Sequence, residues 1–228
     1  MLIAEDDREI AGLIEIHLLG EGYGVYKAEN GREALDVLRK REVHLVILDI
    51  MMPGMDGLET CRKIREEWNI PILMLSAKSE DIDKILGLSL GADDYMTKPF
   101  NPLELLARVK SQIRRYLYLN PDRTREPNTD IIAVRGLVID QAKHRVKVDG
   151  REIVFTPTEY EIVLLLASNP GRVFNTEEIF ERVWRERYFQ SNNTVMVHVR
   201  KIREKLEENP AHPMIIKTVW GVGYKIEG

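Results

Sequence analysis

The sequence contains almost no cysteine and no long uninterrupted run of apolar residues. Cys61 is the single cysteine in 228 residues, so no intrachain disulfide can form, which fits a reducing compartment. With no Cys or His at ligand spacing, we interpret Cys61 as a packing residue. No run reaches the about 18 apolar residues of a membrane span. The N-terminus also lacks the basic start and apolar core of a signal peptide. We therefore expect a cytoplasmic protein with no membrane partner.

The chain also lacks the overall excess of basic residues that is typical of nucleic-acid-binding proteins. Its net charge is −4, but the two halves differ. Residues 1–120 carry 16 basic and 21 acidic residues, whereas residues 121–228 carry 17 and 16. Within residues 182–205 there are seven basic residues against two acids. An acidic half and a locally basic half predict two domains with different tasks.

Short apolar runs alternate with helical patterns in the first half. We expect strands at 2–5, 23–28, 44–49, 70–76 and 95–97, and helices at 8–20, 32–40, 57–67, 81–90 and 102–119. Asn30 and Ser79 are expected N-caps, and Pro102 suits a first helical turn. Five such units predict a parallel sheet with right-handed crossovers. The active crevice of such a sheet lies beyond the carboxyl ends of its strands.

Residues 120–130 contain no apolar side chain and are expected to form a linker. The pattern then changes to short alternating strands over 131–155, with turns at 135–136 and 149–150. Three helices follow, at 156–168, 175–184 and 194–208, the last capped by Asn193. Residues 215–226 are expected to form a hairpin that bends at Gly221 and Gly223. The predicted domains are therefore 1–119 and 131–228.

Polar side chains stand at successive strand ends in the first domain. Glu5 and Asp6 end the first strand, Asp49 ends the third, Ser76 ends the fourth, and Lys98 follows the fifth. Three converging carboxylates repel one another unless a cation lies among them, and all-oxygen ligation suits Mg²⁺. An ionised carboxylate can attack phosphorus, while the metal and Lys98 neutralise the phosphoryl oxygens. Each residue alone is ordinarily a solvated loop residue or a strand terminator, but the combination is specific. We favour Asp49 as the nucleophile.

The first domain resembles receiver domains over residues 1–119. The matching motifs are Glu5-Asp6-Asp7, Leu48-Asp49-Ile50-Met51-Met52-Pro53-Gly54-Met55-Asp56-Gly57, Leu75-Ser76-Ala77-Lys78, Gly91-Ala92-Asp93-Asp94-Tyr95 and Lys98-Pro99-Phe100. The resemblance implies a CheY-like (flavodoxin-like) doubly wound sheet of the α/β class. The usual first strand has one or two more residues before Leu2, so the sequence is expected to be slightly truncated there.

The resemblance also assigns roles to individual residues. Asp49 is implied to be the phosphoacceptor, with a histidine kinase as donor, and Lys98 the phosphate-facing cation after a cis peptide bond to Pro99. Asp6, Asp49 and the backbone carbonyl of Met51 are implied as direct Mg²⁺ ligands, with Glu5 bound through water. Ser76 and Tyr95 are implied to form the switch, although a buried Tyr95 is equally well read as a core residue. Self-catalysed phosphotransfer and dephosphorylation follow from the same resemblance.

A dimer surface is expected on the fourth helix, fifth strand and fifth helix. Exposed charges are usually only solvated. In relatives, however, residues that match Lys84 and Glu104, Asp94 and Arg108, and Asp93 and Arg115 pair across a two-fold interface. The resemblance therefore predicts a homodimer on phosphorylation, with these pairs setting the register.

The helix that begins near Thr194 separates into two faces by helical spacing. Val195, Val199, Ile202 and Leu206 are expected to face the core. The opposite side is expected to carry Thr194, Val197, His198, Lys201 and Lys205, flanked by Arg200 and Arg203. A helix with one apolar and one basic face is ordinarily just a surface helix of a soluble protein, with no DNA-binding role. Its place before a glycine-bearing hairpin favours entry into the major groove of double-stranded DNA.

The second domain resembles the winged-helix domain of the OmpR/PhoB family, of the α+β class. The matching motifs are Thr156-Pro157-Thr158-Glu159-Tyr160, residues 193–195, residues 198–206 and residues 218–224. The resemblance implies promoter DNA, arranged as direct repeats, as the ligand. Lys201 is the base-reading candidate, and the phosphate-positioning candidates are Asn193, Thr194, His198, Arg200, Arg203 and Thr218. Val197 is a further expected contact.

Two details of the second domain narrow the resemblance. Trp220 stands where many relatives have an arginine in the wing, so we expect it to pack on the sugar–phosphate backbone. Residues 185–192 are implied to form a loop that contacts RNA polymerase. Residues 188–194 and 216–226 further resemble the VanR-type regulators of glycopeptide resistance.

Three other readings remain open at this point. A phosphohydrolase with an aspartyl nucleophile would share the sheet and Mg²⁺, but Met51 stands where its second aspartate is usual. A DNA-binding protein whose receiver no longer takes phosphate would generally have lost one of the acids or the lysine. An interaction module that acts without DNA leaves the basic helix unexplained.

Overall fold

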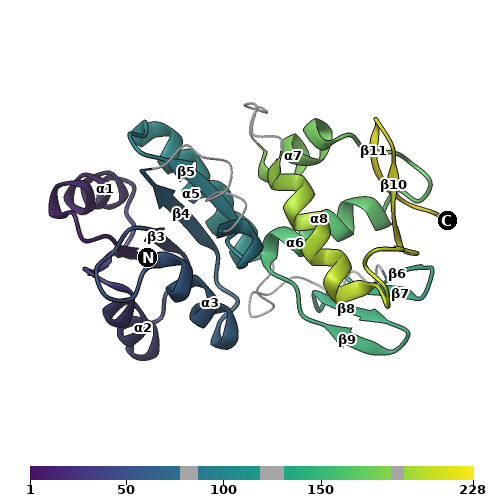
Figure 1. Cartoon of the computed structure of the whole chain (residues 1–228), viewed down its shortest axis with the longest axis horizontal. Coiled ribbons are helices and arrows are strands. Elements are labelled where there is room, and N and C mark those ends of the chain that lie inside the picture. Colours follow the sequence, from purple (N-terminus) through teal and green to yellow (C-terminus); the bar gives the residue numbers. More distant parts are fainter. Residues whose placement is uncertain (78–86, 119–130, 186–192) are drawn as a thin grey trace. The chain divides into compact units, whose positions relative to one another are not determined.

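The chain divides into two compact units, Met1–Tyr116 and Leu117–Gly228, in a computed structural model of the protein (Figure 1). The structure describes residues 1–77, 87–118, 131–185 and 193–228. The predicted linker, residues 120–130, and most of the predicted helix 81–90, with Ser79 and Lys84, lie outside these residues. The loop 185–192 that was expected to contact RNA polymerase also lies outside them, except for Arg185.

The first unit is a parallel five-stranded sheet in the order β2-β1-β3-β4-β5. This order has the reversal between neighbouring crossovers that doubly wound sheets show. The strands are β1 (Leu2–Ala4), β2 (Tyr26–Ala28), β3 (Val46–Asp49), β4 (Ile72–Ser76) and β5 (Asp94–Thr97). The predicted α/β class and the parallel sheet are confirmed.

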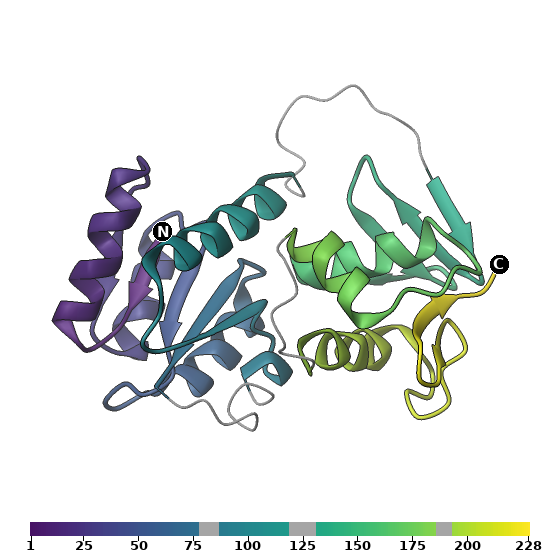
Figure 2. The ribbon, with the colours of Figure 1, turned by 90° about the horizontal axis from the view of Figure 1, so that it is seen from above.

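Helices cover both faces of this sheet, as Figure 2 shows. They are α1 (Arg8–Gly20), α2 (Gly31–Lys40), α3 (Gly57–Glu67) and α5 (Pro102–Tyr118). One core cluster joins α1 and α5 to Ile3, Ile47 and Leu73 of the central strands. The buried residues of β1, β3 and β4 run without interruption because each of these strands is covered on both sides.

Local signals explain where the helices start and where one predicted strand was too long. Asn30 caps α2, as predicted, through its side chain and the Glu33 N–H (3.0 Å). The strand predicted at 23–28 begins only at Tyr26. Gly22 has φ +82° and the Tyr23 N–H still bonds to Leu18 O (3.1 Å), so these residues close the end of α1.

The second unit combines an antiparallel sheet, three helices and a hairpin. The sheet runs β6 (Ile131–Val134), β7 (Leu137–Asp140), β8 (Arg145–Val148) and β9 (Arg151–Ile153). It is followed by α6 (Pro157–Ala167), α7 (Thr176–Trp184), α8 (Asn193–Leu206), β10 (Ile216–Val219) and β11 (Gly223–Ile226). A single core cluster draws residues from all three helices and from both sheets of this unit. The predicted winged-helix arrangement is confirmed.

Buried carboxylates hold this second unit together. Glu159 completes a capping box with Thr156 at the start of α6 and also accepts a hydrogen bond from Lys205 of α8 (2.5 Å). Helix α8 ends at Leu206, two residues before the predicted end. Beyond it, the Glu207 carboxylate accepts the N–H groups of Met214, Ile215 and Ile216 at 2.7–3.1 Å. Glu207 thereby fixes the start of β10 beside the end of α8.

Candidate functional sites

The three acids predicted to converge do lie together at one edge of the first sheet. Ligand oxygens of Glu5, Asp6 and Asp49 are all within 4.8 Å of one another. Glu5 and Asp49 are buried, whereas Asp6 is exposed. The proximity follows from topology because β1 pairs with β3 in parallel, and Ala4 stands opposite Leu48. The cluster is therefore open to solvent on the side of Asp6.

Lys98 provides the positive charge at this edge. Its Nζ lies 2.6 Å from Glu5 Oε2 and 2.9 Å from Asp49 Oδ1. Burial raises the pKa of Glu5, and the neighbouring Asp49 adds to this, while Lys98 acts in the opposite direction. Burial works against the charge on Lys98, but its hydrogen bonds to Glu5 and Asp49 outweigh that effect and raise its pKa. The amine therefore stays charged, and its peptide bond to Pro99 is cis.

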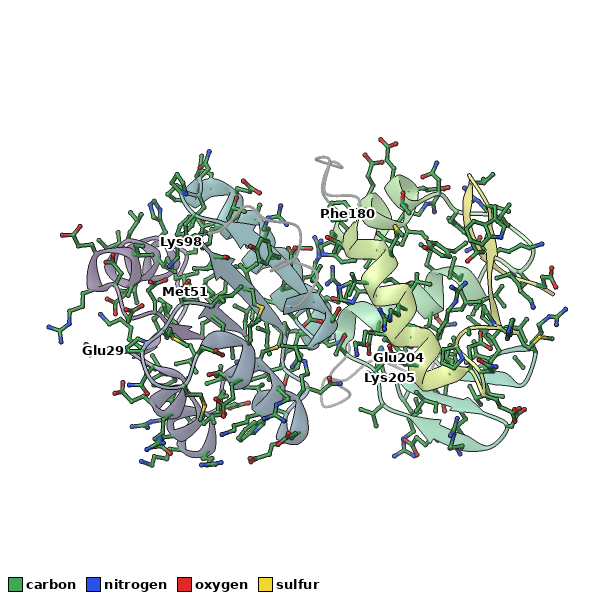
Figure 3. All side chains as sticks on the ribbon, viewed as in Figure 1. Glu29, Met51, Lys98, Phe180, Glu204 and Lys205 are labelled. Atoms are coloured by element: carbon green, nitrogen blue, oxygen red, sulfur yellow. The ribbon has the colours of Figure 1, made fainter. Side chains whose placement is uncertain are left out.

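The donor set at this edge fits a small divalent cation. Three carboxylates supply only oxygen ligands, which is the chemistry that Mg²⁺ prefers. Two of these acids are buried and share one lysine, so the buried part of the site carries more negative than positive charge. Met51 lies on the loop after Asp49 with its side chain exposed, and Figure 3 labels it and Lys98 at this edge.

Gly57 sets the path of the loop that follows Asp49. Its N–H bonds to Ile50 O (3.0 Å). A Cβ placed on Gly57 would lie 2.0 Å from the carbonyl oxygen of Asp49, which is backbone and cannot swing away. Only glycine fits this close approach, and Asp56 caps the helix that starts there through the Glu59 N–H (2.8 Å). The loop thus holds Asp49 against the start of α3.

Ser76 and Tyr95 lie on neighbouring strands next to the acidic edge. In the β4–β5 register, Met74 stands opposite Tyr95 and Ser76 opposite Thr97. Both Ser76 and Tyr95 are buried. The Ser76 carbonyl accepts the Lys98 N–H (2.7 Å), which ties the end of β4 to the lysine. The structure therefore brings Ser76 and Lys98 together at the strand ends, as predicted from their positions.

The charged residues expected on a dimer surface are mostly satisfied within the chain. Asp94 and Arg108 make a two-pronged pair (3.0 and 2.8 Å), and Arg108 also bonds Glu104 (2.8 Å). The prediction that Asp93 lies on the surface is wrong, since it is fully buried. Arg65 binds its carboxylate (2.7 Å), and the Ile72 N–H binds the same oxygen (3.0 Å).

Two further residues of that predicted surface are also enclosed. Asp94 and Arg115 are buried, and Arg115 donates to Gln112 on its own helix (3.1 Å). Arg65, which was not among the predicted site residues, also donates to the carbonyls of Gly91 and Ile70 (2.8 and 2.6 Å). An arginine in an amphipathic helix gives no sequence signal for such a role.

The face prediction for α8 is partly wrong. Val195, Val199, Ile202 and Leu206 are buried as expected. Thr194, Val197 and His198 are buried too, although they were assigned to the opposite side. The helix contacts both α6 and α7, so its covered arc is wider than one apolar stripe. His198 illustrates this, because its ring lies 5.5 Å from that of Trp184 on α7.

The outward side of α8 carries Met196, Arg200 and Glu204, spaced one turn apart. Glu204 bonds Arg200 (3.2 Å) and Lys201 (2.9 Å), and those hydrogen bonds hold its pKa below the ordinary value, with Lys201 the larger influence. Asn193 is the first residue of the helix, and its side chain lies outside the described residues.

Arg203 points into its own unit. Its guanidinium donates to Ile216 O (2.7 Å) and Thr218 Oγ1 (2.8 Å), and burial lowers its pKa. Arg203 and Thr218 were both predicted to contact phosphate. In the structure they bond to each other and so join α8 to the hairpin. Trp220, at the hairpin bend, is 90% exposed. An indole so fully exposed is rare and is available to a partner.

No helix among the described residues combines the length and apolar character needed to cross a membrane.

Comparison with known proteins identifies both units. Residues 1–110 match the family model of the response regulator receiver domain. Residues 150–226 match the model described as the C-terminal part of transcriptional regulatory proteins.

Relatives resemble the chain over its whole length. Regulatory protein VanR of Enterococcus faecium is 47% identical over 228 residues, covering 100% of this chain and 98% of its own. Regulatory protein VanRc of Enterococcus gallinarum is 46% identical over 227 residues, with 100% and 98% coverage. The predicted resemblance to VanR-type regulators is confirmed.

Solved structures agree with these relatives. The response regulator DrrB of Thermotoga maritima, an OmpR/PhoB homologue, is 33% identical with a TM-score of 0.51, covering 100% of this chain and 98% of its own. A mutant of RitR is 27% identical with a TM-score of 0.74 and the same coverage. The chain belongs to the OmpR/PhoB family of response regulators, which are transcription regulators with a receiver domain and a DNA-binding domain.

Proposed function

We propose that Asp49 accepts a phosphoryl group from a histidine kinase and that this controls binding of the second unit to promoter DNA. The observation that carries the proposal is the cluster of Glu5, Asp6 and Asp49 with Lys98 bonded to two of them. A carboxylate beside a fixed cation and a metal-binding oxygen set is suited to phosphoryl transfer. We propose residues 1–119 as the receiver domain and residues 131–228 as the DNA-binding domain.

In the proposed reaction an oxygen of Asp49 attacks the phosphorus of a phosphohistidine. The new oxygen–phosphorus bond forms as the nitrogen–phosphorus bond breaks, and the electron pair leaves with the imidazole. Glu5, Asp6, Asp49 and the Met51 carbonyl would hold Mg²⁺, which when bound supplies charge neutralisation on the phosphoryl oxygens. Lys98 lies 2.9 Å from Asp49, so its ammonium group would also neutralise negative charge on the phosphoryl oxygens once the group is bound to Asp49. Hydrolysis of the resulting acyl phosphate by the same site would end the signal.

Ser76 and Tyr95 form the proposed switch. Ser76 ends β4, one residue beyond Leu75, which stands opposite Asp49, so its hydroxyl would be expected to reach a phosphoryl group there. Movement of that hydroxyl would open space beside β5 for the Tyr95 ring. A bias of a few kcal/mol between two arrangements is enough to change which one dominates.

Dimerisation through the fourth helix, β5 and α5 would involve Lys84, Glu104 and Arg108, together with the edges of the buried Asp94 and Arg115. Asp93 would instead stay with Arg65 in the interior. Arg108 already bonds Asp94 and Glu104 within the chain. Pairing across a two-fold axis would therefore exchange partners rather than create new ion pairs. Such an exchange contributes little affinity but sets the register of the two subunits.

On DNA, α8 would enter the major groove, with Lys201 reading a base. Arg200 on its exposed side, together with Asn193, Arg203 and Thr218, would contact phosphates. The buried Thr194, Val197 and His198 would support the helix from within its own unit. Trp220 would pack against the sugar–phosphate backbone from the hairpin, and residues 185–192 would meet RNA polymerase. We also propose that the operators are direct repeats and that the protein is cytoplasmic.

The test is the intact mass of the chain after incubation with a small phosphodonor, with and without Mg²⁺. We expect one added phosphoryl group on the wild type with Mg²⁺ and none on Asp49→Asn. Equal labelling of both proteins would show that Asp49 is not the acceptor. Labelling of neither would favour a DNA-binding protein that works without phosphate.

A further inference from the structure

The cations of α8 differ in how they are used within the domain. Arg203 is bonded to the hairpin, through Ile216 O and Thr218 Oγ1. Lys205 is bonded to the buried Glu159 of α6. Arg200 and Lys201 remain on the outward side, and Glu204 binds both of them through separate carboxylate oxygens. Figure 3 labels Glu204 and Lys205 near the end of α8.

Glu204 stands on the surface with the cations that DNA would need. Met196, Arg200 and Glu204 follow one another at intervals of four residues, and the Arg200 side chain is 77% exposed. Glu204 remains ionised because its partners hold its pKa below the ordinary value. A carboxylate in this place repels phosphates and competes with them for Arg200 and Lys201.

We propose that Glu204 is a specificity-determining residue of the DNA-binding surface. By holding Arg200 and Lys201 in ion pairs, it weakens binding to DNA of arbitrary sequence. On a matching site the competition is offset, because a carboxylate accepts a hydrogen bond from the amino group of cytosine and Lys201 can read a neighbouring guanine. The inference rests on the proposed DNA-binding function and adds how wrong sequences are rejected.

The expected size of the effect follows from the number of phosphates that the protein neutralises. Binding to arbitrary DNA depends on how many phosphates are neutralised, and each contributes about 0.9 to the salt slope of the affinity. Releasing Arg200 and Lys201 from Glu204 should let about one more cation engage a phosphate. Exposed ion pairs are individually weak, so we expect a gain of about two- to tenfold in affinity for arbitrary DNA.

The experiment compares Glu204→Gln and Glu208→Gln in the full chain, with a small phosphodonor and Mg²⁺ present so that every protein is phosphorylated. Glu208 follows the helix and is exposed, so its substitution makes the same change in net charge. The affinity of each protein is measured for two DNA samples over a series of KCl concentrations. One is a pool of random-sequence duplexes, and the other is the duplex from that pool that the wild type retains best. Glu204→Asp keeps the charge and should behave like the wild type.

We expect Glu204→Gln to bind random duplexes about two- to tenfold more tightly than either the wild type or Glu208→Gln, with a salt slope steeper by about one. Its preference for the retained duplex should fall. An unchanged affinity, an equal gain in both glutamine variants, or an equal gain on both kinds of duplex would overturn the inference. If the phosphorylated wild type binds no duplex at any salt concentration, the proposed function fails instead.

Discussion

Replacing Lys98 with methionine tests whether the buried charge pair at the acidic edge is structurally important. Methionine has similar length but no charge, so Glu5 and Asp49 would remain buried with no cation between them. Removing one partner of a buried pair typically costs about 3–5 kcal/mol. Because about 1.4 kcal/mol corresponds to a factor of ten, the opening equilibrium of the first unit should rise about 10²- to 10⁴-fold.

Hydrogen exchange measures this quantity separately for each unit. Amides of β1 and β3 in Lys98→Met should exchange about 10²- to 10⁴-fold faster than in the wild type, while those of α8 should be unchanged. Saturating Mg²⁺ should restore most of the protection, since a bound cation replaces the lost charge. The control is Lys63→Met, which removes an exposed partner of Glu59 and should change exchange by less than about fivefold.

The same protection of Lys98→Met and Lys63→Met in the absence of Mg²⁺ would refute the prediction. Protection of the wild type and Lys98→Met by Mg²⁺ to the same factor would refute it too. Either result would mean that the acids at this edge do not depend on a cation for their stability.

Three further predictions concern other residues. Gly57→Ala should destabilise the first unit by about 1–3 kcal/mol and impair phosphorylation, because its Cβ would meet the Asp49 carbonyl at 2.0 Å. Gly12→Ala, with open space around it in α1, should instead stabilise the unit by about 0.5–1 kcal/mol. Urea unfolding, monitored by hydrogen exchange in the first unit, measures the change in stability of each variant. Glu207→Gln should destabilise the second unit by about 1.5–3 kcal/mol, because its carboxylate binds three backbone N–H groups. The control, Glu208→Gln, should change the stability by less than about 0.5 kcal/mol. Equal hydrogen-exchange rates of the β10 amides in the two variants would contradict this. Burial lowers the pKa of His144 below its ordinary value of 6.5, with Asp140 acting in the opposite direction, so the unfolded chain binds the proton more readily. The stability of the second unit should therefore fall as the pH drops below about 6.5, and a His144→Gln variant with the same pH profile would refute that origin.

The acidic edge could be predicted because it depends on strand order and on which residues stand at strand ends. Apolar runs located β1, β3 and β4, and parallel pairing then required Glu5 and Asp49 to meet. The pairing of Lys98 with Glu5 as well as Asp49 could not be predicted, because side-chain reach depends on the path of the loop after β5.

The errors on Asp93 and α8 share one physical cause. Periodicity identifies the most apolar face of a helix or strand, but it does not show how many neighbours enclose the remaining faces. Asp93 is enclosed by Arg65 from a helix some distance away in the sequence. His198 is enclosed because α7 lies beside α8 and brings Trp184 against it. Such contacts are set by tertiary packing rather than by the local pattern.

The most direct test of the central claim is whether phosphorylation of Asp49 changes DNA binding by the full chain. The affinity is measured on duplexes selected with the phosphorylated wild type, for that protein and for Asp49→Asn, with and without a small phosphodonor and Mg²⁺. We expect the phosphodonor to tighten binding by the wild type and to leave Asp49→Asn unaffected. The same affinity with and without phosphodonor in the wild type, or an equal response in Asp49→Asn, would contradict the proposed control.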